Sequence, residues 1–251
     1  MSCVNIRGCC IGEGRPKVIL PIVERTETAI LEKAAQFSTL RADCVEWRVD
    51  LFEGFLDAAA IARCVQKLRV ALRDKLLLVT FRTKAEGGAQ ALSHTEYLAF
   101  LGLILDTDCA DLLDIEFFTA GADLPALVNQ VHSAGAAVVC SSHDFAKTPP
   151  RAELISRMVQ MQQAGADLPK LAVMPQSRTD VLELLAATAE MADLHPETPV
   201  ITMSMGALGA VSRLAGEALG SAMTFANPGQ ASAPGQVSLN IVNEVLDALH
   251  L

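Results

Sequence analysis

Residues 166–175 read A-D-L-P-K-L-A-V-M-P and predict a short buried strand, because an apolar run bounded by prolines is too short for a helix. Lys170 lies in the middle of this run. Burial disfavours the charged ammonium and makes the free amine more available. A neutral lysine amine is the usual group with which a protein that uses no cofactor forms an imine with a carbonyl compound. Two alternatives stay open here: a lysine paired with a carboxylate, and a lysine that reaches solvent from a strand end.

Short apolar runs of this kind alternate with longer amphipathic stretches along most of the chain. The predicted strands lie at 17–23, 43–49, 76–81, 111–116, 136–141, 168–174, 199–203 and 222–225. Helical patterns lie near 27–42, 57–73, 93–107, 123–134, 151–164, 178–194, 208–219 and 238–250, with plausible N-caps at Thr26, Asp57, Ser93, Ser177 and Ser238. Eight strand–helix units in about 230 residues is the count of a (β/α)8 barrel.

The strands are continuous apolar runs rather than alternating ones, as expected of parallel strands that helices cover. A doubly wound sheet is the main alternative, but no G-x-G-x-x-G follows the first strand. We therefore predict an α/β fold, a (β/α)8 TIM barrel, in which residues 1–251 form a single domain. Residues 1–16 are expected to form a short N-terminal hairpin or cap. Residues 229–236, rich in Ala, Ser, Pro and Gly, are the candidate lid loop.

The composition is that of a soluble protein with a large core. Of the 251 residues, 51% are hydrophobic and 20% charged. The net charge of −9 argues against a nucleic-acid surface, and no apolar run is long enough to span a membrane. The N-terminal residues lack the pattern of a secretory signal. The seven cysteines are mostly isolated and show no zinc-like spacing, so we expect reduced thiols, a cytoplasmic location and no metal site.

In a barrel, active-site groups project from the carboxyl ends of the strands, so polar residues there are the candidates for function. Glu46 and Arg48 are two apart and share one face of their strand; such a pair binds a polar ligand or forms a structural core network. Arg82 at the next strand end favours an anionic or hydroxylated ligand. Glu86 precedes two glycines, in a loop able to bring its carboxylate over the barrel mouth, although a solvent-facing loop glutamate fits equally.

His143 is the only histidine at a strand end, one strand away from Lys170, where it could move protons for the lysine. The neighbouring Asp144 suggests a metal ligand, but no second histidine or acidic cluster completes a site. The small-residue loop at 204–209 resembles one that opens a helix and holds a phosphate. Arg213 would lie within two turns of that opening and bind a phosphate or a carboxylate.

These residues together make the chain similar to the type I 3-dehydroquinate dehydratases (3-dehydroquinases). The matching segments are E-W-R-V-D (46–50), T-F-R-T-K-A-E-G-G (80–88), S-S-H-D-F-x-K-T-P (141–149), A-D-L-P-K-L-A-V-M-P (166–175), I-T-M-S-M-G (201–206), S-R-L-A-G-E (212–217) and A-S-A-P-G-Q (231–236). They occur in the family's order over nearly the whole chain. The family fold is a (β/α)8 barrel, in agreement with the strand count.

The resemblance implies dehydration of 3-dehydroquinate to 3-dehydroshikimate in the shikimate pathway, without a cofactor, by a homodimer. Lys170 matches the imine-forming lysine, His143 the acid–base residue and Glu86 the carboxylate that orients it. Arg213 matches the partner of the substrate carboxylate. The remaining substrate-binding positions are Glu46, Arg48, Arg82, Ser232 and Gln236.

One position departs from the family pattern, since Pro21 stands where a serine is expected and removes one peripheral substrate contact. Two other functions compete with this interpretation. A lysine-imine aldolase or transaldolase acting on a sugar phosphate would also use the strand-end arginines and the 204–209 loop, but the segments at 141–145 and 231–236 follow the dehydratase pattern. A non-catalytic barrel that binds a pathway metabolite would be favoured by loss of Lys170, His143 or Glu86, and all three are present.

Overall fold

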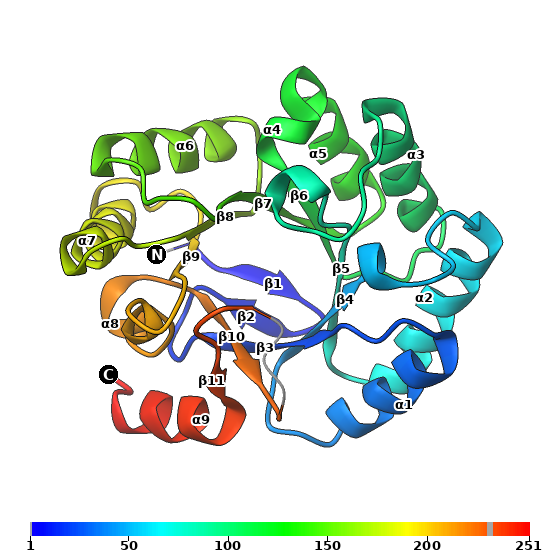
Figure 1. Cartoon of the computed structure of the whole chain (residues 1–251), viewed down its shortest axis with the longest axis horizontal. Coiled ribbons are helices and arrows are strands. Elements are labelled where there is room, and N and C mark those ends of the chain that lie inside the picture. Colours follow the sequence, from blue (N-terminus) through cyan, green and yellow to red (C-terminus); the bar gives the residue numbers. More distant parts are fainter. Residues whose placement is uncertain (1, 230–232) are drawn as a thin grey trace.

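The computed structural model describes residues 2–229 and 233–251, and Figure 1 shows helices arranged around a curled sheet. Nine strands form this sheet in the order β11-β10-β3-β4-β5-β6-β7-β8-β9, and every neighbouring pair is parallel. The bounds are β3 (Lys17–Ile22), β4 (Cys44–Arg48), β5 (Leu76–Thr80), β6 (Leu112–Glu116), β7 (Ala137–Asp144), β8 (Leu168–Val173), β9 (Ile201–Ser204), β10 (Met223–Asn227) and β11 (Val237–Ser238).

The sheet closes into a barrel between β9 and β10. Val200, just before β9, forms a parallel bridge with Ser221, and the amide of Ala222 donates to the Val200 carbonyl at 2.8 Å. The strands β3 to β10 are therefore the eight strands of the barrel, and β11 adds only a short parallel pairing with β10. The predicted (β/α)8 barrel is confirmed.

Helices follow the strands around the outside of the barrel (Figure 1). They are α1 (Glu27–Phe37), α2 (Ala58–Leu72), α3 (His94–Leu105), α4 (Phe117–Ala120), α5 (Leu124–Ser133), α6 (Arg151–Gln163), α7 (Arg178–Leu194), α8 (Gly216–Leu219) and α9 (Leu239–Ala248). Thr26, Asp57, Ser93 and Ser177 each accept a first-turn backbone N–H through the side chain. In the described parts of the chain, no helix is both long enough and apolar enough to cross a bilayer.

The continuous helix predicted at 208–219 is wrong. The segment forms only a 3₁₀ turn at Ala210–Arg213 and the short helix α8. Its start is tied to the end of β9, because the Ser212 hydroxyl donates to the Gly209 carbonyl at 2.7 Å and accepts from the Ser204 amide at 2.9 Å. A Cβ at Gly209 would lie 2.3 Å from the Ser204 carbonyl oxygen, so the chain passes too close to β9 for a helix surface to form. The loop at 204–209 therefore does not open the α-helix that the sequence predicted.

Alternate residues of the strands pack into two separate apolar clusters. In β5, Leu77 and Val79 point outward and join the cluster that includes Leu68 of α2, whereas Leu76 and Leu78 fill the barrel interior. Because both faces of each strand are covered, the runs are apolar throughout rather than alternating, as the sequence indicated.

An antiparallel hairpin of β1 (Val4–Ile6) and β2 (Cys9–Ile11) precedes the barrel, in agreement with the predicted cap. Ile11 is fully buried and packs into the interior cluster with Leu76 and Leu112 from the amino ends of β5 and β6. The hairpin therefore closes the end of the barrel opposite the carboxyl ends of the strands.

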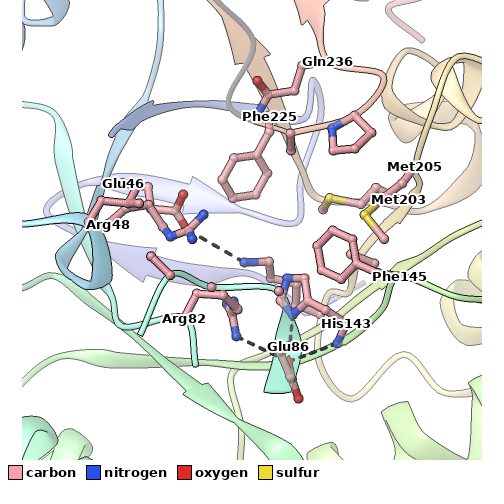
Figure 2. Close-up of a pocket in the computed structure, with 18 of the residues that line it drawn as sticks. Glu46, Arg48, Arg82, Glu86, His143, Phe145, Met203, Met205, Phe225 and Gln236 are labelled. Carbon is pink, nitrogen blue, oxygen red and sulfur yellow. Dashed lines mark hydrogen bonds and ion pairs between the residues drawn. The ribbon is translucent and has the colours of Figure 1, made fainter. Parts of the chain in front are cut away.

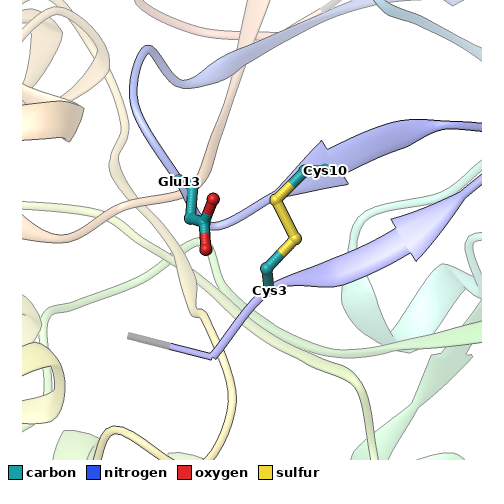
Figure 3. A group of neighbouring side chains, drawn as sticks. All are labelled: Cys3, Cys10 and Glu13. Carbon is teal, nitrogen blue, oxygen red and sulfur yellow. A yellow bond between two sulfur atoms is a disulfide. The ribbon is translucent and has the colours of Figure 1, made fainter.

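The prediction of reduced thiols is wrong for Cys3 and Cys10, which form a disulfide in the hairpin (Figure 3). Strand pairing explains the bond: Val4 lies opposite Ile11 and Asn5 opposite Cys10, which brings the Cα atoms of Cys3 and Cys10 to 5.7 Å, within the usual disulfide range. Spacing along the sequence gave no sign of this pairing. The other described cysteines are free thiols: Cys9, Cys44, Cys64, Cys109 and Cys140.

Candidate active site

A cavity of about 400 Å³ opens at the carboxyl ends of the strands (Figure 2). It brings together eight of the nine predicted site residues: Glu46, Arg48, Arg82, Glu86, His143, Lys170, Arg213 and Gln236. The ninth, Ser232, lies outside the described residues, as does part of the predicted lid at 229–236. Pro21 lies opposite Glu46 in the sheet but is not among the described residues that line the cavity.

Lys170 is almost fully buried in β8, with 2% of its surface exposed. Its Nζ lies 3.0 Å from Asp114 Oδ2 and 4.0 Å from Glu46 Oε1, and 4.9 Å from the centre of the Phe225 ring. The burial expected from the sequence and the alternative of a carboxylate partner therefore both hold. A lysine held this way has a fixed position and a fixed counter-charge at the edge of the cavity.

His143 and Glu86 form a buried pair on the cavity wall. Nδ1 of the imidazole lies 2.8 Å from Glu86 Oε2. Burial lowers the pKa of His143 well below 6.5, and the positive charges of Arg82 and Lys170 lower it further. The imidazole is therefore neutral near pH 7. With Nδ1–H donated to Glu86, Nε2 carries the free lone pair and can take a proton.

Burial also favours the neutral form of Glu86 and raises its pKa to about 8, against the opposing effect of Arg82. Glu86 Oε2 accepts from His143, while Oε1 is buried and has no hydrogen-bond partner among the described residues. Oε1 is thus the oxygen that can carry a proton without disturbing the contact to His143.

Arg82 lines the cavity and is also surrounded by carboxylates. Its guanidinium lies 2.8 Å from Asp114, 2.9 Å from Glu116 and 3.4 Å from Glu86, and it donates to the Ser141 hydroxyl at 3.0 Å. Burial lowers the pKa of Arg82, but the three carboxylates raise it by more, so the group stays charged. Its main visible contacts hold the acidic residues in place.

Unlike Arg82, Arg213 is a buried guanidinium without an acidic partner among the described residues. Its terminal nitrogens meet only the Met203 sulfur at 3.7 Å and the Pro234 carbonyl at 3.2 Å, and Nε has no partner there. Burial lowers its pKa to about 10. An uncompensated buried cation of this kind is stabilised by an anion that enters the cavity.

Glu46 and Arg48 share the inner face of β4 as predicted, but they do not pair with each other. Arg48 binds Asp50 through Nε at 2.8 Å and through a terminal nitrogen at 2.9 Å. Glu46 accepts from the Thr80 hydroxyl at 3.0 Å.

Comparison with known proteins agrees with this geometry. Residues 18–251 match the type I 3-dehydroquinase family. The chain belongs to that family. It is 47% identical over 250 residues to the 3-dehydroquinate dehydratase of Bacillus subtilis (strain 168), covering 100% of this chain and 98% of the relative. It is 42% identical over 250 residues to that of Salmonella agona, with coverage of 100% and 99%.

Solved structures of 3-dehydroquinate dehydratases share the fold over nearly the whole chain. The type I 3-dehydroquinate dehydratase of Clostridium difficile with covalently modified comenic acid superposes with a TM-score of 0.96 at 42% identity, covering 99% of this chain and 98% of that one. The Enterococcus faecalis 3-dehydroquinate dehydratase gives 0.93 at 40%, covering 99% and 100%. The predictions of this family, and of an enzyme of this class, are confirmed.

Sequence reasoning assigned no role to two groups of residues, one that lines this type I 3-dehydroquinase cavity and one that lies buried behind its wall. The first is an apolar wall, made of Phe145, Ala172, Met203, Met205 and Phe225. The second is the pair Asp114 and Glu116, fully buried in β6. A signal for the second existed in L-L-D-I-E, where two carboxylates two residues apart share one face of an otherwise apolar strand. No such signal marks the apolar wall, because core residues look the same.

Proposed function

We propose that the protein eliminates water from 3-dehydroquinate to give 3-dehydroshikimate through a Schiff base on Lys170. The observation that carries the proposal is a buried lysine that shares a cavity with a neutral histidine. The register supports it, because Ser141 of β7 lies opposite Lys170 of β8. His143 therefore lies two residues nearer the mouth of the barrel on the same face, where it can reach a carbon attached to the lysine nitrogen.

The reaction begins when the neutral amine of Lys170 attacks the ketone carbon of the substrate. A C–N bond forms, and the carbonyl oxygen takes one proton from the attacking nitrogen and a second from solvent. The oxygen then leaves as water, and the product is a protonated imine. The protonated imine withdraws electrons more strongly than the ketone, so the neighbouring C–H becomes acidic enough for Nε2 of neutral His143 to take its proton. The electron pair moves onto the imine nitrogen and gives an enamine.

In the second half, the enamine electrons expel the hydroxyl group from the next carbon, and His143 returns its proton to that leaving group as water departs. Addition of water to the re-formed imine then frees the product and Lys170. Glu86 holds the Nδ1–H of His143 throughout, so one imidazole can accept and return the same proton.

Substrate binding follows from the charges that line the cavity. Arg213 is proposed to bind the substrate carboxylate, since it is buried and has no acidic partner among the described residues. Glu46, Arg48 and Arg82 are proposed to contact the ring hydroxyls. Ser232 and Gln236, on the candidate lid at 229–236, would complete the contacts.

The experiment that tests the proposal is the intact mass of the protein after incubation with 3-dehydroquinate and borohydride, followed by peptide mapping. We expect a reduced adduct of ligand size on the peptide that contains Lys170, and none in Lys170→Ala. A folded wild-type protein that gives no adduct would contradict the Schiff-base chemistry.

The place of the enzyme in the shikimate pathway and its assembly as a homodimer are parts of the proposal that rest on the family resemblance. Its cytoplasmic location is a part that rests on the composition of the sequence. Sedimentation of the purified protein tests the dimer directly. A monomer at micromolar concentration would contradict that part and leave the chemistry untouched.

A further inference from the structure

Asp114 is fully buried in β6, behind the cavity wall, and touches the one nitrogen on which the chemistry depends. Its Oδ2 lies 3.0 Å from Lys170 Nζ. Its Oδ1 accepts from Arg82 at 2.8 Å and from the Ser141 hydroxyl at 2.7 Å. Both oxygens are therefore occupied, and the carboxylate has a single orientation relative to Nζ.

The protein keeps this carboxylate charged. Burial raises the pKa of Asp114, but the positive charges of Arg82 and Lys170 and the hydrogen bond from Ser141 lower it by more, and the net direction is downward. Glu46 adds a second carboxylate oxygen 4.0 Å from the same nitrogen, and the face of the Phe225 ring lies 4.9 Å away. Positive charge at Nζ is therefore favoured from three sides.

We propose that Asp114, with Glu46 behind it, is a catalytic counter-ion that keeps the Lys170 imine protonated. This inference rests on the proposed Schiff-base function and adds a residue to it. When the imine forms, its nitrogen stays attached to the lysine side chain, and its positive charge lies where the ammonium charge lay. The same carboxylate therefore stabilises both species.

Protonation of the imine decides whether the reaction proceeds. A neutral imine is a poor electron acceptor, and the adjacent C–H then resists removal by His143. Nearby carboxylates favour the charged form, and a partner within about 4–6 Å typically shifts such an equilibrium by about 1–3 pH units. The counter-ion thus extends the pH range over which the iminium persists toward the alkaline side.

A purely structural role for Asp114 is the alternative, because it also supports Arg82. A change at Glu116 distinguishes the structural role from the counter-ion role. Glu116 lies in the same strand, is fully buried, and binds the same guanidinium at 2.9 Å. Its other described contacts are the amide and hydroxyl of Thr83, the hydroxyl of Thr119 and the Tyr97 hydroxyl at its own amide. Glu116→Gln therefore makes the same carboxylate-to-amide change in the Arg82 network without removing a charge beside Nζ.

The test compares Asp114→Asn and Glu116→Gln with wild type by the pH profile of kcat and by borohydride trapping on Lys170. We expect the alkaline limb of kcat in Asp114→Asn to move about 1–3 pH units toward acid, with KM changed far less. Trapping in that variant should fall at alkaline pH and persist at lower pH. In Glu116→Gln the alkaline limb should stay at its wild-type position.

If the alkaline limb of kcat had the same position in Asp114→Asn and in Glu116→Gln, the counter-ion role of Asp114 would be overturned. If Asp114→Asn does not fold, Glu46→Gln replaces it, because loss of a charge 4.0 Å from the same nitrogen must move the limb in the same direction. An unmoved limb in Glu46→Gln would then overturn the proposal. Failure of the proposed Schiff-base function can be told apart from failure of the counter-ion role, because the wild-type protein would then form no adduct on Lys170 at any pH.

Discussion

His143 and Glu86 meet through a single oxygen: the ring Nδ1 and the backbone amide of His143 lie 2.8 and 3.1 Å from Glu86 Oε2. The glutamate comes from the 3₁₀ turn at Lys84–Glu86 after β5, and the histidine comes from the end of β7. One carboxylate oxygen thus fixes the tautomer of the imidazole and anchors the strand that carries it. Changes at Glu86 should therefore affect both catalysis and stability.

Glu86→Gln should lower turnover and at the same time remove a pH-dependent loss of stability. The pKa of Glu86 is raised from 4.5 to about 8 by burial, so the folded state retains a proton that the unfolded state releases. The stability gained from this proton is complete below pH 4.5 and is lost as the pH rises through about 8. Glutamine does not ionise, and unfolding by urea near pH 6 and near pH 9 should show a smaller decline in the variant.

Turnover in Glu86→Gln should fall at least about tenfold, because the positive charge on His143, once it takes a proton, favours the ionised form of Glu86, and a neutral amide cannot ionise. A variant whose free energy of unfolding declines with pH as steeply as that of wild type would contradict the raised pKa. One with unchanged turnover would contradict the orienting role.

His143→Ala should reduce turnover about 10²- to 10⁴-fold, the usual contribution of a general acid–base group, while some adduct still forms on Lys170. His132→Ala is the matched control, because His132 is exposed on the outer surface and pairs with Asp167 there. Since the pKa of His143 lies well below 6.5, the acidic limb of wild-type kcat should also lie below that pH. Near wild-type turnover in His143→Ala would sink the acid–base assignment.

Arg213→Met should weaken substrate binding without weakening the fold. A charge-assisted hydrogen bond contributes about 1.5–3 kcal/mol, so KM should rise about 10- to 150-fold. The guanidinium is buried without a described acidic partner, and a methionine of similar length removes that cost, so the free energy of unfolding should stay equal or increase. A substrate analogue with an alcohol in place of the carboxylate should bind wild type and variant alike; discrimination between them would assign Arg213 another contact.

The barrel itself was predictable because its determinants are local. Each strand had to be apolar on both faces, and the run around Lys170 was found within one residue of β8 (Leu168–Val173). The helix predicted at 208–219 was wrong because its obstacle is tertiary: Gly209 passes against the Ser204 carbonyl. The disulfide of Cys3 and Cys10 was missed for the same reason, since only the hairpin pairing brings the two together.

The polar part of the site was also predictable, because the carboxyl ends of barrel strands meet at the mouth of the barrel. A charged residue at the end of an apolar strand therefore lies there. The sequence did not show which charges cancel one another. Arg82 and Arg213 look alike in the chain, yet the first meets three carboxylates and the second meets none among the described residues. That difference depends on distances between strands, which no spacing along the chain encodes.

Gly87→Ala should displace Phe145 from the cavity wall and reduce turnover. Gly87 has φ of +85°, and a Cβ there would lie 2.3 Å from the Phe145 ring, which stacks on His143 with 6.4 Å between centres and 16° between planes. Gly135→Ala is the matched control, since Gly135 has φ of +75° and nothing within 4 Å of its Cβ position. Both variants bear the cost of a left-handed backbone, but only Gly87→Ala also has a clash, which typically adds about 1–3 kcal/mol of destabilisation. Turnover should fall only in Gly87→Ala. Adding Phe145→Leu to that variant should restore part of the turnover, because leucine leaves room for the new Cβ. Equal losses of stability in the two alanine variants would contradict the clash and show that the Phe145 ring moves aside freely.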